Sequence, residues 1–93
     1  MGRVSGRSCI VTGAAQGIGR SIAEALLDEG ASVCFADING KKVAEVADLN
    51  RSVHGENRVA HTQVDVTDRQ AVRAMIEHTV ATFGKLDVNF NNA

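Results

Sequence analysis

Residues 11–19 read VTGAAQGIG and contain three glycines, at positions 13, 17 and 19. Before them, the short apolar run Ser8–Thr12 predicts a β-strand. After them, apolar residues recur at helical spacing over residues 16–29, and Gly30 follows as a helix terminator. The glycines therefore lie in a strand-to-helix turn, where unpaired backbone N–H groups and the helix dipole can hold an anion such as a pyrophosphate.

Each glycine has its own expected role in such a turn. Gly13 allows the chain to turn tightly, Gly17 lets the backbone approach the phosphates, and Gly19 lets the helix pack against the sheet. The spacing G-x-x-x-G-x-G departs from the commoner G-x-G-x-x-G fingerprint, and a glycine turn can also be merely flexible. A dinucleotide site is favoured because an acid, Asp37, follows the next predicted strand.

The rest of the chain continues to alternate between strands and helices. Further strands are predicted over residues 31–36, 58–65 and 86–90, and further helices over residues 41–49 and from an N-cap at Thr67–Asp68 to Gly84. The polar residues 50–57 are predicted to form a loop. The order β-α-β-α-β-α-β predicts an α/β fold, a Rossmann-type doubly wound parallel sheet with strand order 3-2-1-4 that stops after its fourth strand.

Two acids at strand ends are candidate ligands of a nucleotide. Asp37 follows Gly13 at close to the spacing of about 20 residues typical of the acid that binds the adenosine ribose. Its carboxylate would accept hydrogen bonds from the ribose hydroxyls and repel a 2′-phosphate, which favours NAD over NADP. Lys41 and Lys42 keep NADP open. Asp65 could accept from the adenine amino group, with Val66 against the ring, or could simply cap the next helix.

Composition excludes several other classes. A formal net charge of −1 offers no basic field for nucleic acid, and no apolar run is long enough to span a membrane. The N-terminus lacks a signal-peptide pattern, and Cys9 and Cys34 lie in apolar runs typical of free buried thiols, so the expected location is the cytoplasm. His54, His61 and His78 show no metal-ligand spacing; a loop, a strand and a helix surface are their expected places.

Four segments in order, TGAAQGIG, then Asp37, DVTD at 65–68 and LDVNFNNA at 86–93, resemble the short-chain dehydrogenase/reductase family. The resemblance covers the whole chain and implies a single-domain Rossmann fold that binds NAD. Residues 12–19 would hold the pyrophosphate, Asp37 the ribose, Asp65 and Val66 the adenine, while Asn92 would approach the nicotinamide-side ribose. The implied cofactor-binding residues are Thr12, Gly13, Gln16, Gly17, Ile18, Gly19, Asp37, Ile38, Asp65, Val66 and Asn92.

The resemblance also implies what this chain does not contain. The family uses a Ser and a Tyr-x-x-x-Lys pair located after the fourth strand, and this sequence has no Tyr, so none of its residues is expected to be catalytic. Residues 1–93 are therefore expected to be the N-terminal, cofactor-binding part of a longer enzyme. That enzyme would transfer hydride between NAD and a small secondary alcohol or ketone, and as a full-length protein would form a homo-oligomer.

Several alternatives remain open at this point. The segments AAQGIG and FADI are similar to those of bacterial-type polyol and secondary-alcohol dehydrogenases, which favours that type, while 3-oxoacyl reductase and hydroxysteroid types remain open. A non-catalytic nucleotide-binding or sensor module is a second class. A methyltransferase that binds S-adenosylmethionine is a third, since it too uses a glycine-rich turn and an acid after the second strand.

Overall fold

The computed structural model describes residues 4–92. Its four strands are all parallel and pair in the order β3-β2-β1-β4, as the alternation predicts. The strands are β1 Ser8–Thr12, β2 Ser32–Asp37, β3 Val59–Gln63 and β4 Val88–Phe90.

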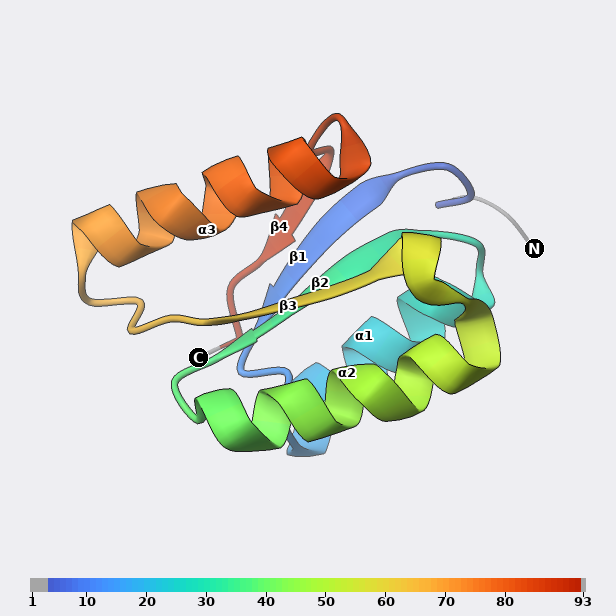
Figure 1. The fold of residues 1–93 in the computed structure, drawn as a ribbon, viewed down its shortest axis with the longest axis horizontal. Helices are drawn as coiled ribbons and strands as arrows, with labels where there is room; N and C mark the ends of the chain where they lie inside the picture. Colours follow the sequence, from blue (N-terminus) through green and yellow to red (C-terminus); the bar gives the residue numbers. More distant parts are fainter. Residues whose placement is uncertain (1–3, 93) are drawn as a thin grey trace.

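Three helices cover the sheet on both faces (Figure 1). They are α1 Gly17–Asp28, α2 Gly40–His54 and α3 Arg69–Phe83, and a 3-10 turn, η1 Glu56–Arg58, precedes β3. Helices α1 and α2 lie on one face and α3 lies on the other, which gives the three layers of a doubly wound fold.

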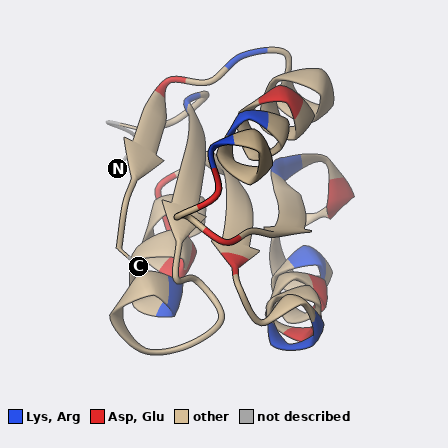
Figure 2. Ribbon diagram, turned by 90° about the vertical axis from the view of Figure 1, so that its left-hand side faces the viewer, with Lys and Arg blue, Asp and Glu red and all other residues tan. Residues whose placement is uncertain are grey.

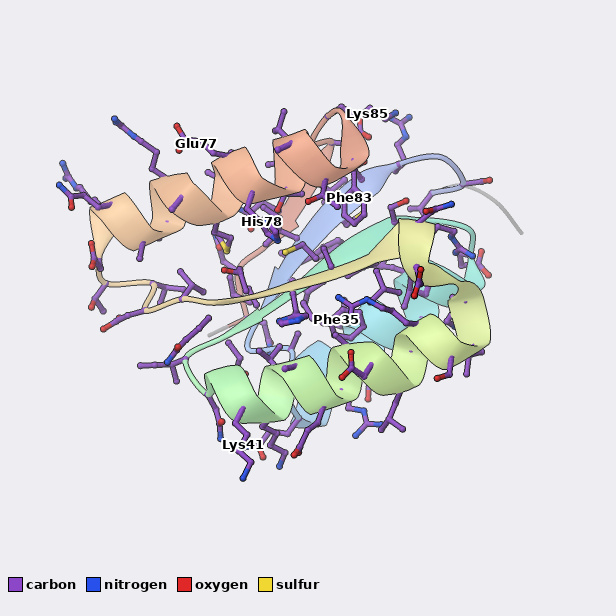
Figure 3. The ribbon with its side chains drawn as sticks, in the orientation of Figure 1. Phe35, Lys41, Glu77, His78, Phe83 and Lys85 are labelled. Carbon is purple, nitrogen blue, oxygen red and sulfur yellow. The ribbon has the colours of Figure 1, made fainter. Side chains whose placement is uncertain are left out.

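Each face of the sheet has its own hydrophobic core. Phe35 lies between the sheet and the layer of α1 and α2, whereas Phe83 lies between α3 and the opposite face (Figure 3). The two cysteines divide in the same way, Cys9 in the first core and Cys34 in the second, and both are free and buried, as expected. Burial raises the pKa of both thiols, so they pack as small apolar groups.

The register of the strands brings their carboxyl ends to one edge of the sheet. Thr12 is paired with Ala36, and Asp37 with Gln63. This edge lies on the left-hand side of Figure 1 and faces the viewer in Figure 2. The residues that follow β1, β2 and β3 therefore meet there, which is where open α/β sheets bind their ligands.

The predicted boundaries were wrong around the second helix. Helix α2 continues to His54, through residues predicted as a loop, because its polar residues have partners. Asn50 is buried and donates to Val46 O and to Glu24 on α1. Strand β3 is shorter than predicted at both ends. Arg58 belongs instead to η1, and its guanidinium donates to the backbone carbonyls of Leu27 and Ala31, while residues 64 and 65 follow the strand.

The charged side chains show no single-sign face in the view of Figure 2, where basic and acidic positions are mixed on the helices. Lys41 and Glu77, for example, point away from the sheet on opposite sides of the molecule (Figure 3). None of the helices within residues 4–92 is long and apolar enough to cross a membrane.

Candidate functional site

A pocket opens at the carboxyl ends of β1, β2 and β3. Its volume is about 150 Å³, and most of its wall is apolar. Its lining residues are Thr12, Gly13, Asp37, Ile38, Val64, Asp65 and Val66. Six of these seven belong to the set of cofactor-binding residues expected from the sequence.

The helix α1 that follows the glycine turn beside this pocket has no side-chain cap at its N-terminus. Gly13 and Gly17 have φ of +67° and +61°, a conformation that side chains rarely adopt. Gln16 stands at the N-cap of α1 but makes no capping bond from its side chain, and a Cβ on Gly17 would meet nothing within 4 Å. Open space in front of an uncapped helix N-terminus fits an anionic group such as a pyrophosphate.

Gly19 is required by a close approach within the turn itself. It is buried, and a Cβ at this position would lie 2.0 Å from the carbonyl oxygen of Gly13. The role predicted for Gly19 was a contact of helix with sheet. The structure places the contact instead with the turn that directly follows β1.

Asp37 links the two turns that border the pocket. Its Oδ2 accepts a hydrogen bond of 3.0 Å from Ala15 N in the glycine turn, and its Oδ1 accepts one of 3.0 Å from Asn39 N ahead of α2. The carboxylate is half-buried and has further lone pairs with which to accept. It is thus held in place by backbone donors while keeping capacity for the hydroxyls of a ribose.

Asp65 closes the turn that leads from β3 to α3. Its Oδ1 accepts from Thr67 Oγ1 at 2.6 Å and from Thr67 N at 2.9 Å. These hydrogen bonds lower the pKa of Asp65, so it is ionised at neutral pH. The cap of α3 is Asp68, whose Oδ1 accepts from Gln70 N and Ala71 N, so the alternative of Asp65 as a helix cap was wrong.

Thr12 and Asn92 join the ends of β1 and β4 behind the glycine turn. Thr12 Oγ1 accepts from Asn92 N at 2.9 Å and donates to Phe90 O at 3.2 Å. The side-chain Nδ2 of Asn92 would be 3.2 Å from a Cβ on Gly13 and 2.7 Å from one on Gly19. Asn92 therefore packs directly against the glycine turn.

The remaining expected residues lie beside the pocket. Gly17 and Ile18 border an open hollow along α1, and Ile18 is 73% exposed. Gln16 is exposed, and its Oε1 accepts a hydrogen bond of 2.7 Å from Lys42 Nζ. The sequence interpretation missed Val64, although it stood inside the predicted third strand, one residue before Asp65.

The histidines were placed correctly except for His54. It is the last residue of α2 rather than part of a loop, and its Nε2 lies 3.4 Å from Asp28 Oδ1. Across the described part of the chain, no three His, Cys, Asp or Glu side chains gather closely enough to hold a metal ion.

Comparison with protein families gives one match that covers nearly the whole chain. Residues 7–93 match the family model described as short chain dehydrogenase. The same motifs that form the pocket and the glycine turn lie within this range. This match decides against the methyltransferase alternative.

Individual relatives agree in sequence and in structure. An uncharacterized oxidoreductase of Mycobacterium tuberculosis is 48% identical over 90% of this chain and 33% of its own length. The human 15-hydroxyprostaglandin dehydrogenase [NAD(+)] is 40% identical over 97% of this chain and 34% of its own length. A short chain dehydrogenase from Mycobacterium smegmatis superposes with a TM-score of 0.93 at 39% identity, covering 100% of this chain and 39% of that one. The chain thus spans about a third of the length of the curated relatives it matches.

Proposed function

Because the chain belongs to the short-chain dehydrogenase family, we propose that it forms the adenosine- and pyrophosphate-binding part of an NAD(H) site. The observation that carries this proposal is the meeting of three features at one sheet edge. They are the pocket between Ile38 and Val66, the uncapped N-terminus of α1, and the Asp37 carboxylate between them. A dinucleotide needs an apolar slot, a diol acceptor and an anion site in that order, for its adenine, its ribose and its pyrophosphate.

The residues present would divide the work as follows. The backbone N–H groups at the start of α1 would hold the pyrophosphate, with Gly17 leaving room for its oxygens. Asp37 would accept from the hydroxyls of the adenosine ribose. Ile38 and Val66, which are 64% and 41% exposed, would cover the two faces of the adenine.

Asp65 and Asn92 complete the assignment. Ionised Asp65 would accept from the adenine amino group through the carboxylate oxygen that Thr67 does not use. Asn92, fixed by Thr12, would lie toward the nicotinamide-side ribose. The bound cofactor supplies the hydride chemistry, whereas this chain's residues bind and orient the adenosine half.

The proposed enzyme oxidises a secondary alcohol or reduces a ketone with NAD(H). Polyols, sugar alcohols, 3-oxoacyl compounds and hydroxysteroids all contain such groups and stay as candidate substrates. NAD is preferred over NADP because the Asp37 carboxylate would face a 2′-phosphate, while the nearby Lys42 ammonium is already bound to Gln16. The proposal includes a homo-oligomeric full-length protein in the reducing cytoplasm, which suits the two free thiols.

The test is to measure NAD and NADP affinity of the purified protein and its Asp37→Ala variant by calorimetry. Loss of charged hydrogen bonds, worth about 1.5–3 kcal/mol, should weaken NAD binding about tenfold to a hundredfold. NADP binding should be unchanged or stronger. The matched control is Asp48→Ala, another aspartate, which lies on α2 and pairs with Arg51. Equal losses for both cofactors would remove the ribose role of Asp37.

A further inference from the structure

We propose that Gln63 is a positioning residue for the adenine part of the site, which it acts on by holding the backbone of Ile38. This inference rests on the proposed function, since it concerns how the same pocket takes its base. Gln63 is the last residue of β3 and directly precedes residues 64–66, the segment after β3 that lines the pocket.

Two hydrogen bonds from the end of β3 fix the segment that follows β2. Gln63 Nε2 donates to Ile38 O at 3.0 Å, and Val64 N donates to Asp37 O at 3.0 Å. The second bond continues the parallel ladder, in which Asp37 is paired with Gln63. The first one is outside the ladder and depends wholly on the glutamine side chain.

A second feature of the chain accommodates the same side chain. Gly40 is the first residue of α2, and a Cβ on it would lie 2.9 Å from Gln63 Oε1, 3.0 Å from Cδ and 3.1 Å from Cβ. The glutamine therefore lies directly over Gly40. Glycine here is not needed for a positive φ, so the close approach of Gln63 is its structural reason.

The contact matters because Gln63 bonds directly to the backbone of Ile38, whereas the other hydrogen bonds nearby reach its neighbours Asp37 and Asn39. The side chain of Ile38 is 64% exposed and belongs to neither hydrophobic core, yet it forms one wall of the pocket opposite Val66. An apolar side chain on an exposed turn binds a planar base more tightly when its backbone is fixed beforehand, because less conformational freedom is lost on binding. Gln63 supplies that fixation while remaining exposed and outside the cores itself.

The experiment compares Gln63→Met with the unmodified protein, using ADP and inorganic pyrophosphate as probes in calorimetry. Methionine keeps the length of the side chain but removes the N–H donor. Loss of one neutral hydrogen bond should weaken ADP binding about threefold to tenfold. Pyrophosphate, which would bind at the glycine turn alone, should bind with unchanged affinity. Gln70→Met, an exposed glutamine at the start of α3, is the control and should leave both affinities unchanged.

A second variant keeps the test independent of how Gln63→Met folds. Gly40→Ala adds a methyl group that displaces the glutamine without straining the backbone, so it should reproduce the selective loss for ADP. In the Gln63→Met background the same change should add little. Equal affinity of ADP for Gln63→Met and the unmodified protein would overturn the inference, as would an equal loss for pyrophosphate, which marks a general structural role. If the unmodified protein binds neither probe, the proposed function fails and this inference fails with it.

Discussion

Helices α1 and α3 begin in opposite ways, although both follow a parallel strand at the same edge of the sheet. Asp68 caps α3, with Oδ1 2.9 Å from Gln70 N and 3.3 Å from Ala71 N. Asn39 caps α2 in the same way, because its Oδ1 accepts a hydrogen bond of 3.0 Å from Lys42 N. At the start of α1, Gln16 makes no side-chain capping bond and contacts Lys42 instead.

A side-chain cap is worth about 1 kcal/mol of stability. The chain forgoes that stabilisation at the N-terminus of α1, which follows the glycine turn that borders the pocket. The difference agrees with the proposal that the first-turn donors of α1 bind a ligand, whereas those of α2 and α3 are bonded within the fold.

The largest expected effect is a difference in stability between alanine substitutions at Gly19 and at Gly17, at the start of α1. Gly19→Ala would bring a Cβ within 2.0 Å of Gly13 O, a backbone atom that cannot move without opening the turn. Overpacking of this severity should lower the free energy of unfolding by about 3 kcal/mol or more. Gly17→Ala meets open space and suffers only its positive φ, a cost of about 1–2 kcal/mol.

Urea denaturation of both variants measures this difference. Gly17→Ala should also weaken pyrophosphate binding, because its methyl group enters the space in front of the helix. A smaller loss of stability for Gly19→Ala than for Gly17→Ala would show that the turn is more pliable than its packing implies.

The next largest effect is expected when the cap is removed from the N-terminus of α3 and a cap is added to the N-terminus of α1. Asp68→Ala should lower the free energy of unfolding by about 1 kcal/mol and leave pyrophosphate binding unchanged. Gln16→Ser should do the reverse, since a serine at the N-cap would bond to the first-turn donors: stability rises by up to about 1 kcal/mol and pyrophosphate affinity falls.

Gln16→Ala is the control for the second exchange, because it removes the contact with Lys42 without adding a cap. Denaturation and calorimetry on the three variants give both quantities. If Gln16→Ser gains stability and binds pyrophosphate as tightly as before, the open donors of α1 are not the anion site.

Local patterns in the sequence were enough for the topology and for most of the pocket. Periodicity and glycine positions predicted the strand order. The positions of Asp37 and Asp65 at strand ends predicted that both acids would lie at the same site, and both line the pocket. Local patterns failed at α2, because the partner that lets the polar Asn50 stay helical, Glu24, is 26 residues away. Burial raises the pKa of Glu24, but hydrogen bonds from Asn50 and Arg20 outweigh it, and the net shift is downward.

Gln63 was missed for the same reason. Its contact with Ile38 joins residues 25 apart and exists only because β3 pairs with β2 in the register that sets Gln63 opposite Asp37. No local pattern contains that register. Residues that bind a ligand through their own chemistry can be recognised by type and spacing, whereas residues that position others become visible only in the fold.

The smallest expected effect concerns the acid ahead of the capped helix. Thr67 lowers the pKa of Asp65 below its usual value of 3.8 through its hydroxyl and its backbone N–H. A carboxyl group with a lowered folded-state pKa contributes stability above its unfolded pKa, and that contribution disappears as the pH falls through the folded value. Thr67→Ala removes the hydroxyl donor, so the pKa of Asp65 should rise toward 3.8. The resulting loss of stability should be present at neutral pH and should disappear in acid, where Asp65 is protonated in both proteins. Thr82→Ala, which removes an exposed hydroxyl from α3 bonded to His78 O, is the control. An NMR titration of the Asp65 carboxyl measures the shift. An unchanged pKa in Thr67→Ala would show that the backbone N–H of residue 67 alone lowers the pKa of Asp65. The turn ahead of α3 would then owe nothing to its neighbouring side chain, just as the N-terminus of α1 receives no capping bond from Gln16.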